Sequence, residues 1–105
     1  MEKFEYINEL MPFYQSLLTS RQNEVLQYYY FDDLSITEIA DLLGISRNAV
    51  HDALKKSVNL ILKYEDKLGL CLSYKKRMQL FEELKSLENS QVDDIVNKLI
   101  NMEDQ

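Results

Sequence analysis

The chain has 105 residues, of which 46% are hydrophobic and only 2 are glycine and 1 proline; this is the composition of one ordered, mostly helical domain with at most a short appendage. No stretch reaches the ~20 apolar residues that a membrane span needs, the acidic N-terminus lacks the apolar run of a signal peptide, and the single cysteine cannot form an internal disulfide. The sequence therefore argues against a membrane protein and a disulfide-stabilised secreted protein, and a cytoplasmic location is expected.

The net charge of −6 is unevenly distributed along the chain. Residues 36–77 carry 8 basic and 5 acidic side chains, whereas residues 1–35 carry 2 and 6 and residues 78–105 carry 2 and 7. Because binding depends on the local surface potential more than on the total charge, the middle of the chain can still attract nucleic acid. The acidic flanks act within a Debye length of about 8–10 Å, so the expected affinity is modest.

The first helix is expected within residues 3–18. Apolar side chains recur there at helical spacing, and their expected role is to support the domain that follows. Pro12 interrupts the pattern, because proline lacks the N–H that a helix interior needs. The sequence therefore predicts a kink or break near Met11.

A second helix is predicted from about Ser20 to Phe31. Thr19 with Gln22 three residues later is a capping box, in which each residue satisfies a backbone N–H of the other. The side chains at inward positions are Val25, Leu26, Tyr29 and Tyr30, with Tyr28 nearer the surface. For most of these rings, packing in the core is expected rather than stacking on bases.

Residues 35–56 have the pattern of two short helices joined by a tight turn. Ser35 with Glu38 is a second capping box, so the first helix of the pair begins at about residue 36. Gly44 ends it, since glycine takes the left-handed conformation common at helix C-termini, and Ser46 caps the next helix. The inward apolar positions are Ile39, Ala40 and Leu43, then Val50, Leu54 and Val58. This order is typical of a helix-turn-helix, whose second helix offers its N-terminal half to a nucleic-acid groove.

Two further helices are expected after this motif. The second motif helix runs toward Tyr64 or Lys67 and stops at Gly69. After Leu72, a new helix carries Tyr74, Met78, Phe81, Leu84 and Leu87 on one side. Ser90 with Asp93 then caps a final helix with an apolar stripe of Val92, Ile95, Val96, Leu99 and Ile100.

The expected fold is therefore all-α: a helix-turn-helix bundle without a wing and with two extra C-terminal helices. Residues 1–68 would form the helix-turn-helix domain with its supporting N-terminal helices, and residues 69–105 a C-terminal extension. The apolar faces of this extension can be covered by residues 1–34 or by the same helices of a second chain. In the second arrangement residues 69–105 are a dimerisation arm.

Seven polar side chains are candidates for contact with nucleic acid: Thr37, Arg47, Asn48, His51, Asp52, Lys55 and Lys56. The arginine suits a guanine edge or a phosphate, and the asparagine suits an adenine edge. The lysines and the threonine hydroxyl suit phosphates, which position a protein without reading sequence, and the histidine can donate to a phosphate or a base. The aspartate can accept from a cytosine amine but opposes phosphate. The competing interpretation is an ordinary solvated helix face.

No catalytic, cofactor or metal site is predicted. His51 is the only histidine and has no cysteine or second histidine at ligand spacing. Cys71 lies between two leucines, as a packed thiol does. The acidic pairs are adjacent in sequence, so on a helix the two carboxylates point in different directions and cannot work as an acid–base dyad.

The motif residues support a resemblance to a known family. Residues 18–56, beginning Leu18-Thr19-Ser20-Arg21-Gln22, resemble the C-terminal helix-turn-helix region of bacterial sigma factors, which reads the promoter −35 element. That region carries more arginine than this chain, which has Ala49 and Asp52 on the equivalent face. Nearly all of the chain resembles the YlxM family of free-standing proteins, through Phe13-Tyr14-Gln15-Ser16-Leu17-Leu18-Thr19, Tyr29-Tyr30-Phe31-Asp32-Asp33-Leu34-Ser35, Glu38-Ile39-Ala40, Ser46-Arg47-Asn48-Ala49-Val50-His51-Asp52 and Tyr64-Glu65-Asp66-Lys67-Leu68.

Members of the YlxM family are encoded beside the signal-recognition-particle GTPase, so the resemblance implies a regulatory or accessory role in that protein-targeting pathway. The expected protein is a non-enzymatic, homodimeric regulator that binds duplex DNA or signal-recognition-particle RNA. The alternative is a protein- or RNA-interaction module that modulates the GTPase without sequence-specific DNA binding. The motif favours nucleic acid as the ligand, and the net charge favours protein.

Overall fold

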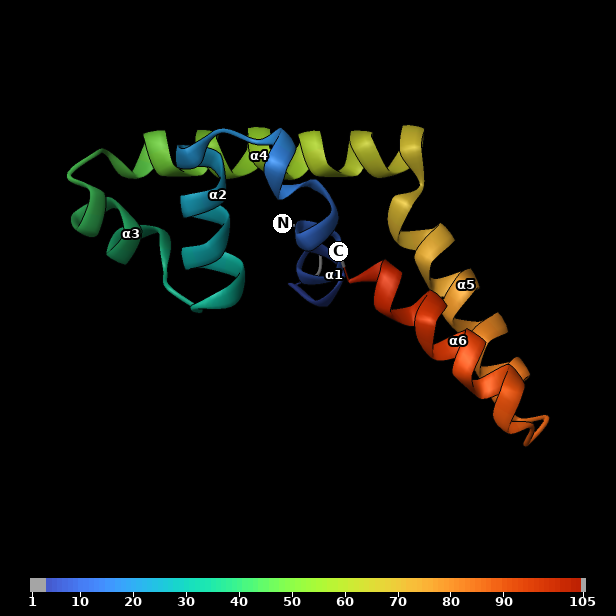
Figure 1. Cartoon of the computed structure of the whole chain (residues 1–105). Coiled ribbons are helices and arrows are strands. Elements are labelled where there is room, and N and C mark those ends of the chain that lie inside the picture. The colour runs from blue at the N-terminus through green and yellow to red at the C-terminus, as the bar shows by residue number, and fades with distance from the viewer. Residues whose placement is uncertain (1–3, 105) are drawn as a thin grey trace. The chain divides into compact units, whose positions relative to one another are not determined.

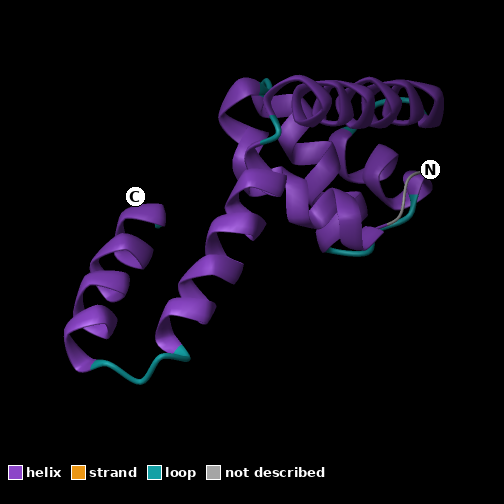
Figure 2. Ribbon diagram, turned by 90° about the vertical axis from the view of Figure 1, so that its right-hand side faces the viewer, coloured by secondary structure: helices purple, strands orange, loops and turns teal. Residues whose placement is uncertain are grey.

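The computed structural model describes residues 4–104 and confirms the all-α fold, with no strand in that range. Gly69 ends the first of two compact units and Leu70 begins the second (Figures 1 and 2). The helical elements of the first unit are α1 (Phe4–Tyr14), η1 (Gln15–Leu17), α2 (Ser20–Leu26), η2 (Gln27–Phe31), α3 (Ile36–Leu43) and α4 (Arg47–Leu68). Those of the second are α5 (Leu70–Lys85) and α6 (Ser90–Glu103).

The long helix α4 is the element on which the first unit is built. Helices α1, α2 and α3 all pack against it (Figure 1). Its buried side chains are Val50, Leu54, Ser57, Val58 and Ile61, and the hydroxyl of Ser57 donates to the carbonyl of Ala53 at 2.6 Å. The rest of the core comes from the other helices: Ile7, Leu10, Met11, Tyr14, Leu18, Val25, Leu26, Tyr30, Ile39 and Ala40. Burial of α4 therefore holds its N-terminal turns in place.

Helix α1 continues through Pro12 to Tyr14, so the predicted break near Met11 is wrong. Pro12 lies in the last turn, where its missing N–H removes only one hydrogen bond and the chain passes directly into η1. The end of the helix is held by Tyr14, which is fully buried. Its hydroxyl donates to Glu65 Oε1 at 2.5 Å, and its ring stacks on Tyr64 with centroids 5.9 Å apart.

The second predicted helix changes type half way along. The Thr19–Gln22 capping box forms as predicted and opens α2, but residues 27–31 form a π-helical turn. A π-turn accommodates one extra residue, so the side chains no longer follow the α-helical spacing. Tyr30 is buried as predicted, but Tyr28 and Tyr29 are half-buried and Phe31 is 61% exposed, which corrects the expectation that most of these rings lie in the core. Tyr30 is held by Phe4, whose ring lies 4.9 Å away.

The second unit is a helical hairpin in which α5 and α6 lie antiparallel (Figure 2). Helix α5 begins at Leu70 itself rather than after Leu72. Helix α6 begins at Ser90, but its cap is Asn89 and not the predicted Ser90. The side-chain oxygen of Asn89 accepts from the N–H groups of Gln91 and Val92 at 3.0 and 3.1 Å, which satisfies two donors at once.

Only part of the predicted apolar stripe of α6 faces its partner helix. Val96 is buried at 1% exposure, whereas Ile95 is 59% and Leu99 39% exposed. At the open end of the hairpin, Arg77 donates two hydrogen bonds to Glu103, at 2.5 and 3.1 Å. These bonds raise the pKa of the Arg77 guanidinium above its ordinary value.

Candidate nucleic-acid interface

The turn between α3 and α4 has the geometry that the sequence predicts. Ser35 and Glu38 form the capping box, with reciprocal hydrogen bonds of 3.1 Å. Gly44 takes the left-handed conformation, with φ of +67°, and the N–H of Ile45 donates back to the carbonyl of Ala40 at 3.1 Å. Ser46 Oγ then accepts from the N–H of Ala49 at 3.0 Å. These short-range bonds determine where α4 begins and which of its faces turns outward.

The seven predicted site residues are all exposed. Arg47, Asn48, His51, Asp52, Lys55 and Lys56 lie on the first ten residues of α4, and Thr37 lies on the first turn of α3. None of these side chains forms a hydrogen bond or an ion pair with another residue in the range 4–104. The structure thus leaves all of their polar atoms available to a ligand.

The candidates fall into two rows, because each helical residue is turned by about 100° from the previous one. Asn48, Asp52, Lys55 and Lys56 point away from the buried Val50 and form the outward row. Arg47 and His51 lie together on the flank. Nine residues at a rise of ~1.5 Å put Lys56 about 14 Å along the helix from Arg47.

The N-terminus of α4 is electropositive. Its first turn contains no acidic side chain, and Arg47 occupies the first helical position. The N–H groups of this turn point out of the helix end, where the helix dipole favours an anion. Asp52 is the only acidic residue among the seven candidates and lies more than one turn beyond that end. The arrangement can hold phosphate close to Arg47.

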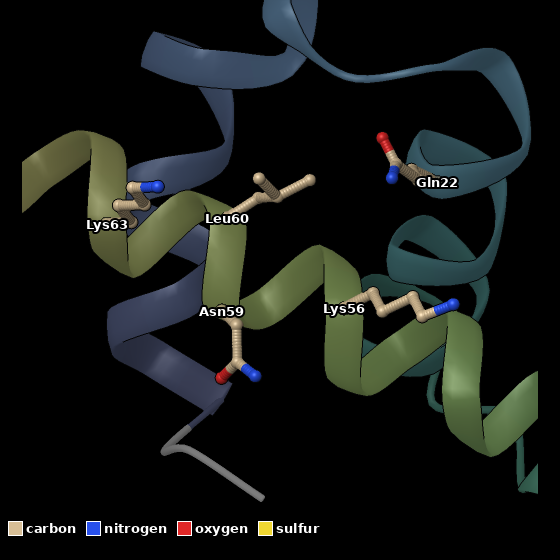
Figure 3. A pocket seen from close by; sticks show the side chains of 5 residues that line it. All are labelled: Gln22, Lys56, Asn59, Leu60 and Lys63. Atoms are coloured by element: carbon tan, nitrogen blue, oxygen red, sulfur yellow. The ribbon is translucent and has the colours of Figure 1, made fainter.

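The structure also shows a groove, mostly apolar in its lining surface, that the sequence reasoning missed. Gln22, Lys56, Asn59, Leu60 and Lys63 line an open groove of about 390 Å³ between α2 and α4 (Figure 3). The spacing of Lys56, Asn59 and Lys63 in the sequence was a signal that the three share a face of α4. Nothing local placed Gln22 beside them, because that proximity depends on how α2 packs on α4.

No cluster of three or more His, Cys, Asp or Glu side chains that could hold a metal ion occurs among the described residues. Within that same range, no helix has both the length and the apolar character to cross a membrane.

The fold and the turn geometry define an all-helical helix-turn-helix protein. The comparison with known proteins then gives the family: residues 1–101 match the model of the UPF0122 family, described as "Putative helix-turn-helix protein, YlxM / p13 like", and the chain belongs to that family.

Relatives match over most of their length. A UPF0122 protein of Listeria welshimeri is 39% identical over 108 aligned positions, covering 97% of this chain and 98% of the relative. A UPF0122 protein of Bacillus thuringiensis is 44% identical over 87 positions, covering 83% and 79%, and one of Exiguobacterium sibiricum is 41% identical over 88 positions, covering 84% and 83%.

Proposed function

We propose that this protein is a non-enzymatic regulator that binds nucleic acid through the N-terminal turns of α4. The observation that carries the proposal is the exposed set of polar side chains on α4, which follows a correctly capped helix-turn-helix and has no partner within residues 4–104. In helix-turn-helix proteins this part of the second helix enters the groove. Helix α3 would position α4 and supply the Thr37 hydroxyl to a phosphate.

The ligand is duplex DNA or a structured RNA. Arg47 and Asn48 have the side chains that read guanine and adenine edges, and Lys55 and Lys56 suit phosphates. The resemblance to the YlxM family adds a role in the signal-recognition-particle pathway, with the particle's RNA as the second nucleic-acid ligand. Such a role places the protein in the cytoplasm.

The second candidate function is protein recognition. The net charge of −6 opposes binding to phosphate and favours a basic protein surface, so α4 would then dock on a protein such as the signal-recognition-particle GTPase.

The hairpin is the proposed dimerisation arm. Large apolar side chains lie exposed on both helices and on the loop between them: Leu80 and Leu84 on α5, Leu87 just after it, and Ile95, Leu99 and Met102 on α6. By helical geometry Ile95, Leu99 and Met102 share one face of α6, and Leu80 and Leu84 share one face of α5. An apolar face of this kind marks an interaction site on a soluble protein. Pairing of two such faces about a two-fold axis would give the homodimer.

The test is the fluorescence anisotropy of labelled random duplex DNA and of labelled signal-recognition-particle RNA, titrated with the protein at low and at physiological salt. We expect binding at low salt that weakens steeply as salt rises, because bound phosphates release counterions. The tighter of the two ligands identifies the nucleic acid. Absence of binding to both at low salt would contradict the proposal and favour the protein-recognition function.

A further inference from the structure

The groove between α2 and α4 carries two cations without counter-ions. Lys56 and Lys63 are exposed, and neither forms an ion pair or hydrogen bond with another residue of the described range. They are seven residues apart on α4, so their positions differ by about 10 Å along the helix axis. Among the described residues, the side chains that line the groove include no carboxylate. The groove therefore presents positive charge at two points of its own lining, with Asp52, Glu65 and Asp66 the nearest acidic residues along the helix.

Gln22 adds a hydrogen-bond donor from the opposite wall. Its Oε1 accepts from the N–H of Thr19 at 2.9 Å in the capping box, which determines the orientation of the amide. The Nε2 group is consequently turned toward α4, as Figure 3 shows. Leu60, which is half-buried, lies between this amide and Lys63 in Figure 3 and forms an apolar floor. Donors around an apolar floor suit a ligand that combines anionic oxygens with a less polar body.

The groove is continuous with the proposed nucleic-acid face. Lys56 belongs to both, and Asn59 and Lys63 extend the outward row that begins at Asn48. In Figure 3 the Asn59 amide points away from Leu60, so it lies on the outer edge of the groove. From Asn48 to Lys63 the row is about 22 Å long. In helix-turn-helix proteins the N-terminal residues of the second helix contact the base edges, so the C-terminal part of this row lies beyond the bases that Asn48 would reach.

We propose that Lys56, Lys63 and the Gln22 amide bind the sugar-phosphate backbone of the nucleic acid, with the sugar over Leu60. This inference rests on the proposed function and adds to it a second contact region outside the helix-turn-helix. Contacts of this kind add affinity and set the register without reading sequence.

The test compares Lys63→Gln with Lys98→Gln, which removes the same charge from α6 in the other compact unit. The anisotropy of the better-bound nucleic acid is measured from low to high salt for both variants and the wild type. One lost phosphate contact lowers the slope of log K against log salt by about 0.9. The ratio of the affinity at 0.1 M salt to the affinity at 1 M salt is then about eightfold smaller than in the wild type. We expect this change for Lys63→Gln and an unchanged slope for Lys98→Gln. Lys63 is exposed, so the variant should fold, and circular dichroism checks this.

The outcomes distinguish failure of the groove proposal from failure of the proposed function. One outcome is that Lys63→Gln keeps the wild-type slope while substitution of Arg47 and Lys55 lowers it. That outcome would overturn the proposal that the groove binds the backbone and would leave the proposed function standing. In that case the groove would be free for an acidic polypeptide. Polyglutamate that bound the wild type without displacing the nucleic acid would confirm that the groove does not bind the sugar-phosphate backbone. No binding by the wild type would instead contradict the proposed function itself.

Discussion

The hydroxyl of Tyr14 donates to the carboxylate of Glu65 at 2.5 Å and so joins the end of α1 to the last turns of α4, 51 residues further along the chain. Tyr14 is fully buried, and Glu65 is half-buried. This bond and the stacking of Tyr14 on Tyr64 hold the C-terminal half of α4 against the domain. The N-terminal half is held independently by Val50 and Leu54.

Tyr14→Phe should lower the stability of the first unit without changing nucleic-acid binding. The variant keeps the ring and removes a hydrogen bond to a charged group, which typically contributes about 1.5–3 kcal/mol. Urea unfolding followed by circular dichroism measures the change in the free energy of unfolding. Tyr64→Leu, which removes the stacked ring and keeps the hydroxyl of Tyr14, is the matched control. A wild-type stability of Tyr14→Phe would show that the bond to Glu65 contributes nothing net.

Gly44→Ala and Gly69→Ala form a second matched pair. Both glycines are left-handed, with φ of +67° and +59°, and a Cβ at either would meet no atom within 4 Å. Each substitution should therefore destabilise by backbone strain alone, about 1–2 kcal/mol. Only Gly44 lies in the turn that orients α4, so Gly44→Ala should also weaken nucleic-acid binding. Equal binding by both variants at a temperature where both are folded would contradict the role assigned to the turn.

The dimer is tested on the exposed side of α6. Ile95→Asp combined with Leu99→Asp should leave the helix content intact and reduce the mass found by sedimentation from that of a dimer to that of a monomer, because both side chains are exposed. Val96→Asp is the contrasting variant. Val96 is buried, so an unpaired carboxylate there should unfold the hairpin and lower the helix signal. A wild-type mass for the double variant would contradict the dimerisation arm.

Asn89→Ala should make the start of α6 exchange its amide protons faster. The variant removes both hydrogen bonds to the first turn, and the loss of a helix N-cap typically costs about 1 kcal/mol. Hydrogen exchange measured for α6 detects the change. Ser90→Ala is the control, because Ser90 was the predicted cap and its side chain does not cap the helix in the structure. Equal exchange in the two variants would mean that Asn89 is not the effective cap.

The parts of the fold that could be predicted from sequence are those determined by near neighbours. Capping boxes, the left-handed glycines and the buried positions of α4 each depend on residues within about one or two turns. The π-turn at residues 27–31 could not be predicted, because it is stabilised by tertiary contacts such as the hydrogen bond from Asn8 Nδ2 to the carbonyl of Tyr30. The position of Gln22 on the wall opposite α4 likewise depends on how two helices pack. The Asn89 cap was missed because Ser90 and Asp93 offered a competing pattern one residue later.

The most direct test of nucleic-acid binding by α4 is the salt dependence of binding by the variant that combines Arg47→Ala with Lys55→Ala. The control is Lys85→Ala combined with Lys98→Ala, which removes two charges from the hairpin instead. If Arg47 and Lys55 each contact a phosphate, the first variant should lose about 1.8 from the slope of log K against log salt, while the control keeps the wild-type slope. The same affinity and slope in the wild type and the Arg47/Lys55 variant would contradict the assignment of α4 as the nucleic-acid-binding helix.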